Sequence, residues 1–153
     1  MKTTKHVEVL VAYTFPAMWA MTKRKLLVVQ NSKAADADYI AFIIIGLMDG
    51  KKHIPGIITH IAKVKKVLAN QPDSNYLENE PLLKGIHDDK EWSGNVKEYY
   101  LESIEELNQP IPHRKGDPAR GQVNFHTTLA EIKKAKVLSD IKTCQQLEKL
   151  AKN

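Results

Sequence analysis

The apolar positions of the chain fall into short runs with the spacing of β-strands. Residues 6–13 (HVEVLVAY) alternate, with a valine at every second position. Residues 40–47 (IAFIIIGL) are apolar throughout, which is typical of a strand buried on both faces. Residues 57–66 (IITHIAKVKK) start with β-branched side chains and end in lysines. We therefore expect a sheet whose central strand, at 57–66, leaves the core as a basic end.

Turn signals between these runs indicate how they connect. Asp49-Gly50 is a dipeptide typical of tight hairpins, so it should join the strand at 40–47 to the strand at 57–66. Pro16 follows the first strand at a position that suits the first turn of a helix. Apolar residues then recur with a roughly helical period over 17–29, although residues 27–29 (LVV) fit a short strand equally well.

The second half of the chain begins with a long polar stretch at about 68–95, punctuated by proline and glycine. A segment of this length is often functional, and a short helix fits near 81–86. Strands are expected at 96–101 (VKEYYL) and 122–127 (QVNFHT), and residues 104–107 either continue the first of these or turn.

Two helices are expected at the C-terminal end. Thr128, followed three residues later by Glu131, has the capping-box pattern and should open a helix at 129–135. A second helix is expected over 139–151. This order lacks the regular strand–helix alternation of a doubly wound fold. We therefore expect a single α+β domain over 1–153, with a small curled, β-barrel-like mixed sheet and flanking helices.

Composition narrows the class of partner. The chain has 153 residues and a formal net charge of +5, which favours an anionic partner such as nucleic acid. Membrane helices need about 20 apolar residues, and no run approaches that length. With a single cysteine and no secretory signal pattern, we expect a cytoplasmic protein without a membrane partner. The basic residues form separate clusters at 23–25, 51–53, 63–66, 114–120 and 133–136.

Sequence signatures of catalysis are missing. The chain has no Walker loop, GxGxxG, HExxH, CxxC or GxSxG motif, and its six histidines are scattered. We therefore predict no catalytic residue, no metal and no cofactor. The acidic group Asp88, Asp89 and Glu91 leaves a nuclease or an RNA-modifying enzyme open as an alternative.

Four blocks of the sequence resemble a known superfamily. They are ADYIAF, PGIITHIAKVKKV, KEYYLESIEELNQPIP and VNFHTTLAEIKKAKVLSDI, and together they span roughly residues 7–141. Their order is similar to that of PUA-like domains, namely the EVE, ASCH and YTH types and the modules attached to restriction systems. The resemblance implies a curled barrel that binds RNA, or DNA carrying a modified base, with one base held in an aromatic pocket. It also implies an effector protein supplied in trans, since many such domains are joined to one.

The same resemblance implies a site between the barrel and the segment after the first strand. The candidate rings are Tyr13, Trp19, Tyr39, His60 and Trp92. The candidate phosphate contacts are Lys23, Arg24, Lys63, Arg114 and Arg120. Base stacking on such rings contributes about 1–3 kcal/mol per base.

Some of these candidate residues also fit a purely structural role. Trp19 and Tyr39 also fit the core, and a histidine in mid-strand such as His60 is usually structural. Trp92 has polar neighbours, and an exposed tryptophan often contacts a partner. A module for binding a protein or a small ligand, in which the basic clusters serve only solubility, therefore remains the second alternative.

Overall fold

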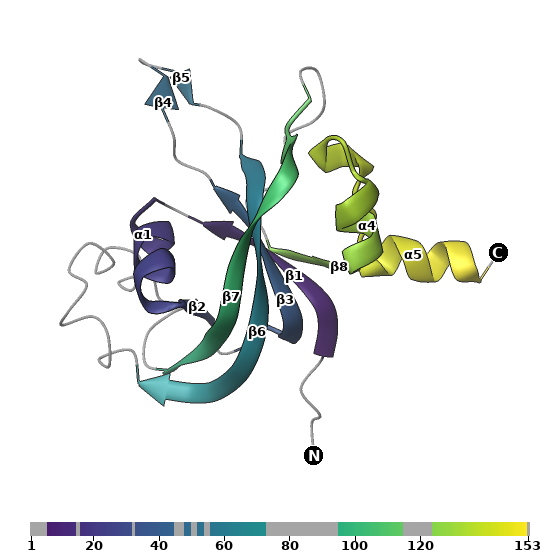
Figure 1. Ribbon diagram of the computed structural model, residues 1–153. Coiled ribbons are helices and arrows are strands. Elements are labelled where there is room, and N and C mark those ends of the chain that lie inside the picture. The colour runs from purple at the N-terminus through teal and green to yellow at the C-terminus, as the bar shows by residue number, and fades with distance from the viewer. Residues whose placement is uncertain are drawn as a thin grey trace.

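The computed structural model describes most of the chain, namely residues 6–14, 16–31, 33–44, 48–49, 52–53, 56–72, 95–114 and 124–152. The strands are β1 (His6–Thr14), β2 (Leu27–Asn31), β3 (Asp36–Ile44), β4 (Met48–Asp49), β5 (Lys52–His53), β6 (Ile57–Pro72), β7 (Asn95–Pro112) and β8 (Phe125–Thr127). The helices are α1 (Pro16–Lys25), α4 (Leu129–Lys134), the 3-10 turn η3 (Leu138–Asp140) and α5 (Cys144–Ala151). Figure 1 shows their arrangement.

Six of the strands form one mixed sheet in the order β2-β7-β6-β3-β1-β8. The pair β1–β3 is parallel and the other pairs are antiparallel, so the expected mixed α+β class is confirmed. The antiparallel pairing of β3 with β6 also confirms the predicted hairpin. The short pair β4–β5 lies between these two strands in the chain, on either side of the expected turn.

The sheet curls around a core on one of its faces. Residues from β1, β2, β3, β6 and β7 pack there together, and Leu10, Phe42 and Tyr99 are among the most buried. The edge strands β2 and β8 are linked through the side chain of Asn124, which directly precedes β8. The Asn124 amide Nδ2 donates to Gln30 Oε1 at 2.8 Å, and the Tyr13 N–H donates to Asn124 Oδ1 at 3.0 Å. No backbone ladder joins β2 to β8 in the described residues, so the sheet is not closed, and the barrel-like part of the prediction is not confirmed.

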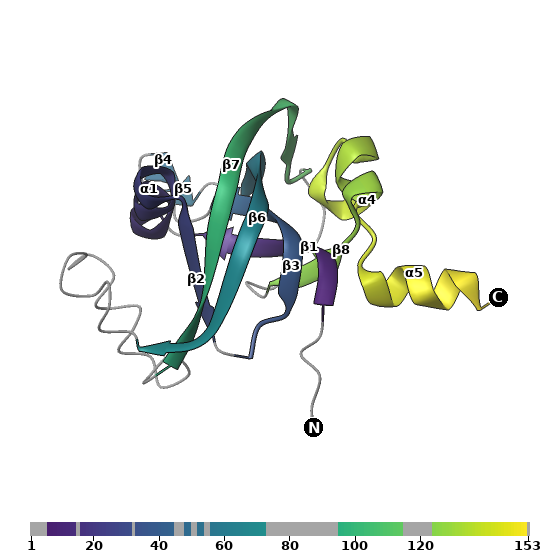
Figure 2. The same ribbon diagram turned by 60° about the horizontal axis from the view of Figure 1, so that its bottom comes forward.

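Two helical layers cover the outer face of this sheet. Residues of β1, β3 and β6 pack there against Ile132, Leu138 and Ile141, which belong to α4, η3 and the residue after η3. The α1 helix packs Met18 and Met21 against β2 and β7. The two layers lie at different ends of the sheet (Figures 1 and 2).

Several predicted boundaries were wrong. The helical pattern over 17–29 ends at Lys25, and 27–31 form β2, so of the two alternatives left open for 27–29 the strand is confirmed. The strand at 57–66 continues to Pro72, because β7 runs beside it for its whole length. Residues 104–107 belong to β7, which is 18 residues long.

The C-terminal end was also only partly predicted. The Thr128 hydroxyl accepts from the Glu131 N–H at 3.3 Å, which confirms the expected start of α4. Of the strand expected at 122–127, residues 122 and 123 lie outside the described residues, Asn124 is not part of a strand, and β8 begins at Phe125. The second helix begins at Cys144 and not at 139, since Thr143 caps it and η3 precedes it. The suggested helix near 81–86 lies outside the described residues.

Candidate functional site

Trp19 and His60 lie together, as the expected site requires. Trp19 reaches from α1 to the core enclosed by the curl of the sheet, where its ring centroid lies 4.9 Å from that of Phe42 on β3. The His60 ring on β6 lies 5.0 Å from the same tryptophan, with an angle of 53° between the ring planes. Both Trp19 and His60 are half-buried, so each has surface left for a ligand. Phe42 is fully buried and fixes Trp19 from beneath.

His60 is held in place by its neighbour. The Thr59 hydroxyl lies 2.8 Å from His60 Nδ1, and the direction of this hydrogen bond depends on the imidazole tautomer. The ring can therefore present its other nitrogen to a ligand as either a donor or an acceptor. Two tilted, half-buried rings with one adaptable polar atom are suited to a flat, heteroatom-bearing group such as a nucleobase.

Cations lie beside these rings. Lys23 Nζ is 5.5 Å from the centroid of Trp19, within the range of a cation–π contact. Arg24 and Lys25 follow it, and all three side chains of this last turn of α1 are exposed. On β6, Lys66 Nζ lies 4.9 Å from the centroid of Tyr100.

The strand register places Lys66 near the end of α1. Lys66 pairs with Tyr100 on β7, and Tyr100 pairs in turn with Leu27, the first residue of β2. Adjacent strands are about 4.8 Å apart, so the backbones of Lys66 and Leu27 are about 10 Å apart. Leu27 follows α1 by two residues. Lys66 nevertheless lies over Tyr100, which packs with Met18 and Met21 and not with the inner core of Trp19. Lys23 is therefore the cation that contacts Trp19 among the described residues.

Other candidate residues lie on the opposite face. Tyr39 and Lys63 face each other across β3 and β6, and both line a cleft of about 840 Å³ beneath α4. Tyr39 and Tyr13 pack with the outer core, whereas Trp19 packs with the inner one. Lys63 is also paired, since its Nζ lies 3.6 Å from Glu102 Oε2. The described candidate residues are therefore divided between the two faces of the sheet.

Three further candidates complete the comparison with the sequence. Arg114 is exposed just beyond the end of β7. Trp92 and Arg120 lie outside the described residues, as do the acidic residues Asp88, Asp89 and Glu91 of the enzyme alternative.

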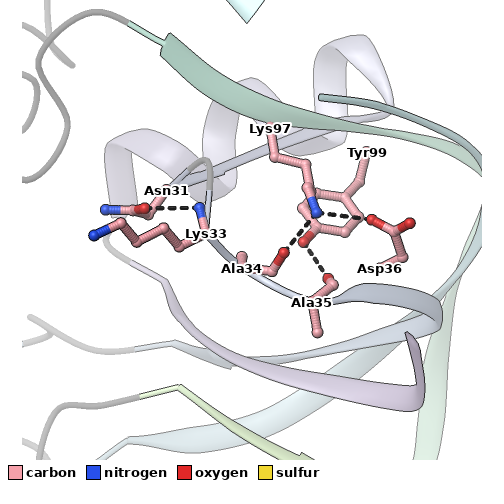
Figure 3. Close-up of polar contacts among 7 residues, drawn as sticks. All are labelled: Asn31, Lys33, Ala34, Ala35, Asp36, Lys97 and Tyr99. Atoms are coloured by element: carbon pink, nitrogen blue, oxygen red, sulfur yellow. Dashed lines mark hydrogen bonds and ion pairs between the residues drawn. The ribbon is translucent and has the colours of Figure 1, made fainter. Parts of the chain in front are cut away.

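A buried lysine, which the sequence did not single out, holds the loop between β2 and β3 (Figure 3). Lys97 Nζ donates to the Ala34 carbonyl at 2.6 Å and lies 2.8 Å from Asp36 Oδ1, with 2% of the lysine side chain exposed. Two residues further along β7, the Tyr99 hydroxyl donates to the Ala35 carbonyl. Burial and, to a lesser extent, the charge of Asp36 raise the pKa of Tyr99 well above its usual value.

The sequence held one signal for this network. Lys97 and Tyr99 are two residues apart on a predicted strand and therefore share a face. Because Tyr99 belongs on the core side, Lys97 must enter the protein as well. A buried ammonium needs partners, and the loop carbonyl and carboxylate supply them.

Within the part of the chain that the structure describes, no three His, Cys, Asp or Glu side chains are grouped so as to hold a metal ion. In the same residues, no helix is both long and apolar enough to cross a lipid bilayer. No family model, curated protein or solved structure gives a significant match to the chain.

Proposed function

We propose that this chain is a nucleic-acid-binding module that takes one base of RNA, or a modified base of DNA, against Trp19 and His60. The observation that carries the proposal is the half-buried tryptophan that lies 5.0 Å from the histidine ring and 5.5 Å from the Lys23 ammonium. A flat base can stack on the exposed part of such a ring, while cations at its edge hold the phosphates on either side.

Each residue of the proposed site has its own role in binding. Trp19 supplies the stacking surface, and Phe42 keeps it from turning inward. His60 reads a polar edge of the base. Lys23 and Arg24 contact the backbone, which makes binding dependent on salt. The curled sheet and the position of α1 after the first strand support the PUA-like resemblance, and the proposal keeps the effector in trans that this resemblance implies.

A fluorescence titration tests the proposal directly. The chain has two tryptophans, so Trp92→Phe leaves Trp19 as the single reporter. We expect short single-stranded RNA, or DNA duplexes that carry modified bases, to quench Trp19 in a saturable way at low salt. Saturable quenching by RNA and not by modified DNA, or the reverse, would identify the ligand.

The cations at the end of α1 have their own test. In the same background, Lys23→Ala with Arg24→Ala should weaken binding and lower the slope of log K against log salt by about 1.4, at about 0.7 per lost contact to a single strand. The matched control is Lys149→Ala with Lys152→Ala, which removes the same charge from α5 and its C-cap and should leave the slope unchanged.

Two results would contradict the proposal. One is the absence of salt-dependent binding to any of these nucleic acids. The other is equal weakening by the two double variants, which would mean that only net charge matters. Cleavage of the probe during the titration would favour the enzyme alternative and would call for the Asp88, Asp89 and Glu91 alanine variants.

A further inference from the structure

Glu106 lies beside His60, on the face of the sheet that Trp19 contacts. It is the cross-strand partner of His60 on β7, and Phe42 is the partner of His60 on β3. The three residues therefore form one row across the strands. Directly opposed residues have their Cβ atoms about 4.5–5.5 Å apart on the same face. The Glu106 side chain thus stands next to the imidazole that contacts Trp19.

The regular part of the same ladder gives Glu106 the same orientation. Ile104 pairs with Ala62, both pack with the inner core, and Glu106 follows Ile104 by two residues. Glu105 pairs instead with Ile61, which packs with the outer core. Glu106 also borders the cleft beneath α4, but register and alternation both place its side chain on the inner face.

The strands are irregular at this point. β6 pairs with both β3 and β7 through Ile58 and His60, and both ladders pass over Thr59 between them. On β7 the partners of Ile58 and His60 are separated by residues 107–110, which form a bulge directly after Glu106. Bulges are common beside binding sites because they redirect side chains. The irregularity also positions the imidazole, since the Thr59 hydroxyl lies 2.8 Å from His60 Nδ1.

The Glu106 carboxylate is open to a ligand. It is exposed, and none of the ion pairs among the described residues includes it. An ionised carboxylate accepts hydrogen bonds and cannot donate one. It also repels phosphate. A nucleic acid that reaches Trp19 must therefore present hydrogen-bond donors to Glu106, and not its backbone.

The Watson–Crick edges of the bases differ in what they offer to a carboxylate. Guanine has two adjacent donors, N1–H and the N2 amino group, which match the two oxygens of one carboxylate. Adenine and cytosine place a lone pair beside their amino group, and uracil and thymine flank their single N–H with carbonyl oxygens. Guanine also has O6, which can accept from His60 Nε2 when Nδ1 accepts from the Thr59 hydroxyl.

We propose that Glu106 and His60 select guanine as the base that stacks on Trp19. This selectivity rests on the proposed function, because it names the base that the same site takes. Glu106 accepts from guanine N1–H and N2–H, while His60 Nε2 donates to O6. Since the carboxylate is exposed to water, we expect a preference of about tenfold over the other bases, at the lower end of what bidentate contacts provide.

Trp19 fluorescence in the Trp92→Phe background measures this preference. The probes are short oligouridylates, and oligothymidylates for DNA, with a single guanine, hypoxanthine, adenine or cytosine at the centre. The guanine probe should bind about tenfold more tightly than the adenine and cytosine probes. Hypoxanthine lacks only the N2 amino group of guanine, so its affinity should fall between those of guanine and adenine.

Glu106→Gln is the decisive variant. Its amide keeps the shape of the side chain but has one acceptor in place of two, so the preference for guanine over adenine should fall from about tenfold to about twofold. Loss of a negative charge strengthens binding to every probe alike, and the readout is therefore the ratio of two Kd values.

Glu105→Gln is the matched control. It removes the same charge one residue away, on the opposite face of the sheet, and should keep the full preference for guanine. An equal loss of preference in both variants would show that charge alone matters, and would overturn the role of Glu106.

The remaining outcomes separate this selectivity from the proposed function. Equal affinity for all probes, or a guanine preference that survives Glu106→Gln, would overturn the selectivity and leave nucleic-acid binding intact. Binding only to duplexes with modified bases would have the same meaning. Absence of binding to any nucleic acid would refute the proposed function, and the identity of the base with it.

Discussion

The buried ion pair under the β2–β3 loop should respond very unequally to the loss of either partner. The Lys97 side chain is 2% exposed and that of Asp36 is 35% exposed. Asp36→Ala leaves an ammonium in the interior with the Ala34 carbonyl as its described partner, and such a stranded charge costs about 3–5 kcal/mol. Lys97→Met removes the buried charge itself and leaves a carboxylate that water can reach. The main loss is then one hydrogen bond to a carbonyl, about 1–2 kcal/mol.

We therefore expect Asp36→Ala to lower the free energy of unfolding by about 2 kcal/mol more than Lys97→Met does. The double variant should be more stable than Asp36→Ala alone, since no charge is stranded. Urea unfolding followed by circular dichroism measures all three variants, with a constant slope as the check that the transition is unchanged.

The exposed pair Lys63–Glu102 is the matched control. Its side chains are 55% and 57% exposed, so Glu102→Ala should cost at most about 1 kcal/mol. Equal losses in Asp36→Ala and Lys97→Met, or a double variant whose loss is the sum of the two, would refute the argument that the position of the ammonium decides the cost.

Three further predictions concern single residues. Leu26 has a positive φ of 52° after α1, so Leu26→Gly should stabilise the protein by up to about 1 kcal/mol in urea unfolding, whereas Leu26→Ala should not. Asn124→Ala removes the amide shared by the sheet edges and should cost about 1–2 kcal/mol, while Asn124→Asp, which keeps the acceptor for the Tyr13 N–H, should cost less. Glu131 has a pKa below its usual 4.5, mainly through its contact with Lys134 and then through the Lys142 N–H. Its stabilising contribution is therefore complete above pH 4.5 and is lost as the pH falls through the lower pKa of the folded state, so acid titration should destabilise Glu131→Gln less than the wild type.

The strands that the sequence predicted well are those with a local signal. Alternation found β1, and the aspartate–glycine turn predicted the pairing of β3 with β6. Residues 27–29 had no such signal, because three apolar residues after a helix fit both periods. They form a strand because they pair with Tyr99 and Tyr100, about 70 residues away in the sequence. The local pattern of apolar residues contains no information on that contact.

The grouping of the candidate residues followed from the sequence only in part, for a similar reason. His60 and Lys63 are an odd number of residues apart on one strand, so alternation alone places them on opposite faces, as the structure confirms. The family resemblance implies that both residues belong to one site, but the alternation of side chains along the strand places them on opposite faces of the sheet. The contact of Trp19 with His60 depends on how α1 packs against the sheet, which no spacing in the sequence encodes.

The ladder between β6 and β7 also bears on how this chain can be altered. Pro72 and Asn95 are cross-strand partners, so the chain leaves and re-enters the sheet at one place. Closing a longer connection there costs only about 0.6 kcal/mol for each doubling of its length. A reporter, a tether or a second folded unit can therefore be inserted between these two residues with little loss in the free energy of unfolding of the sheet.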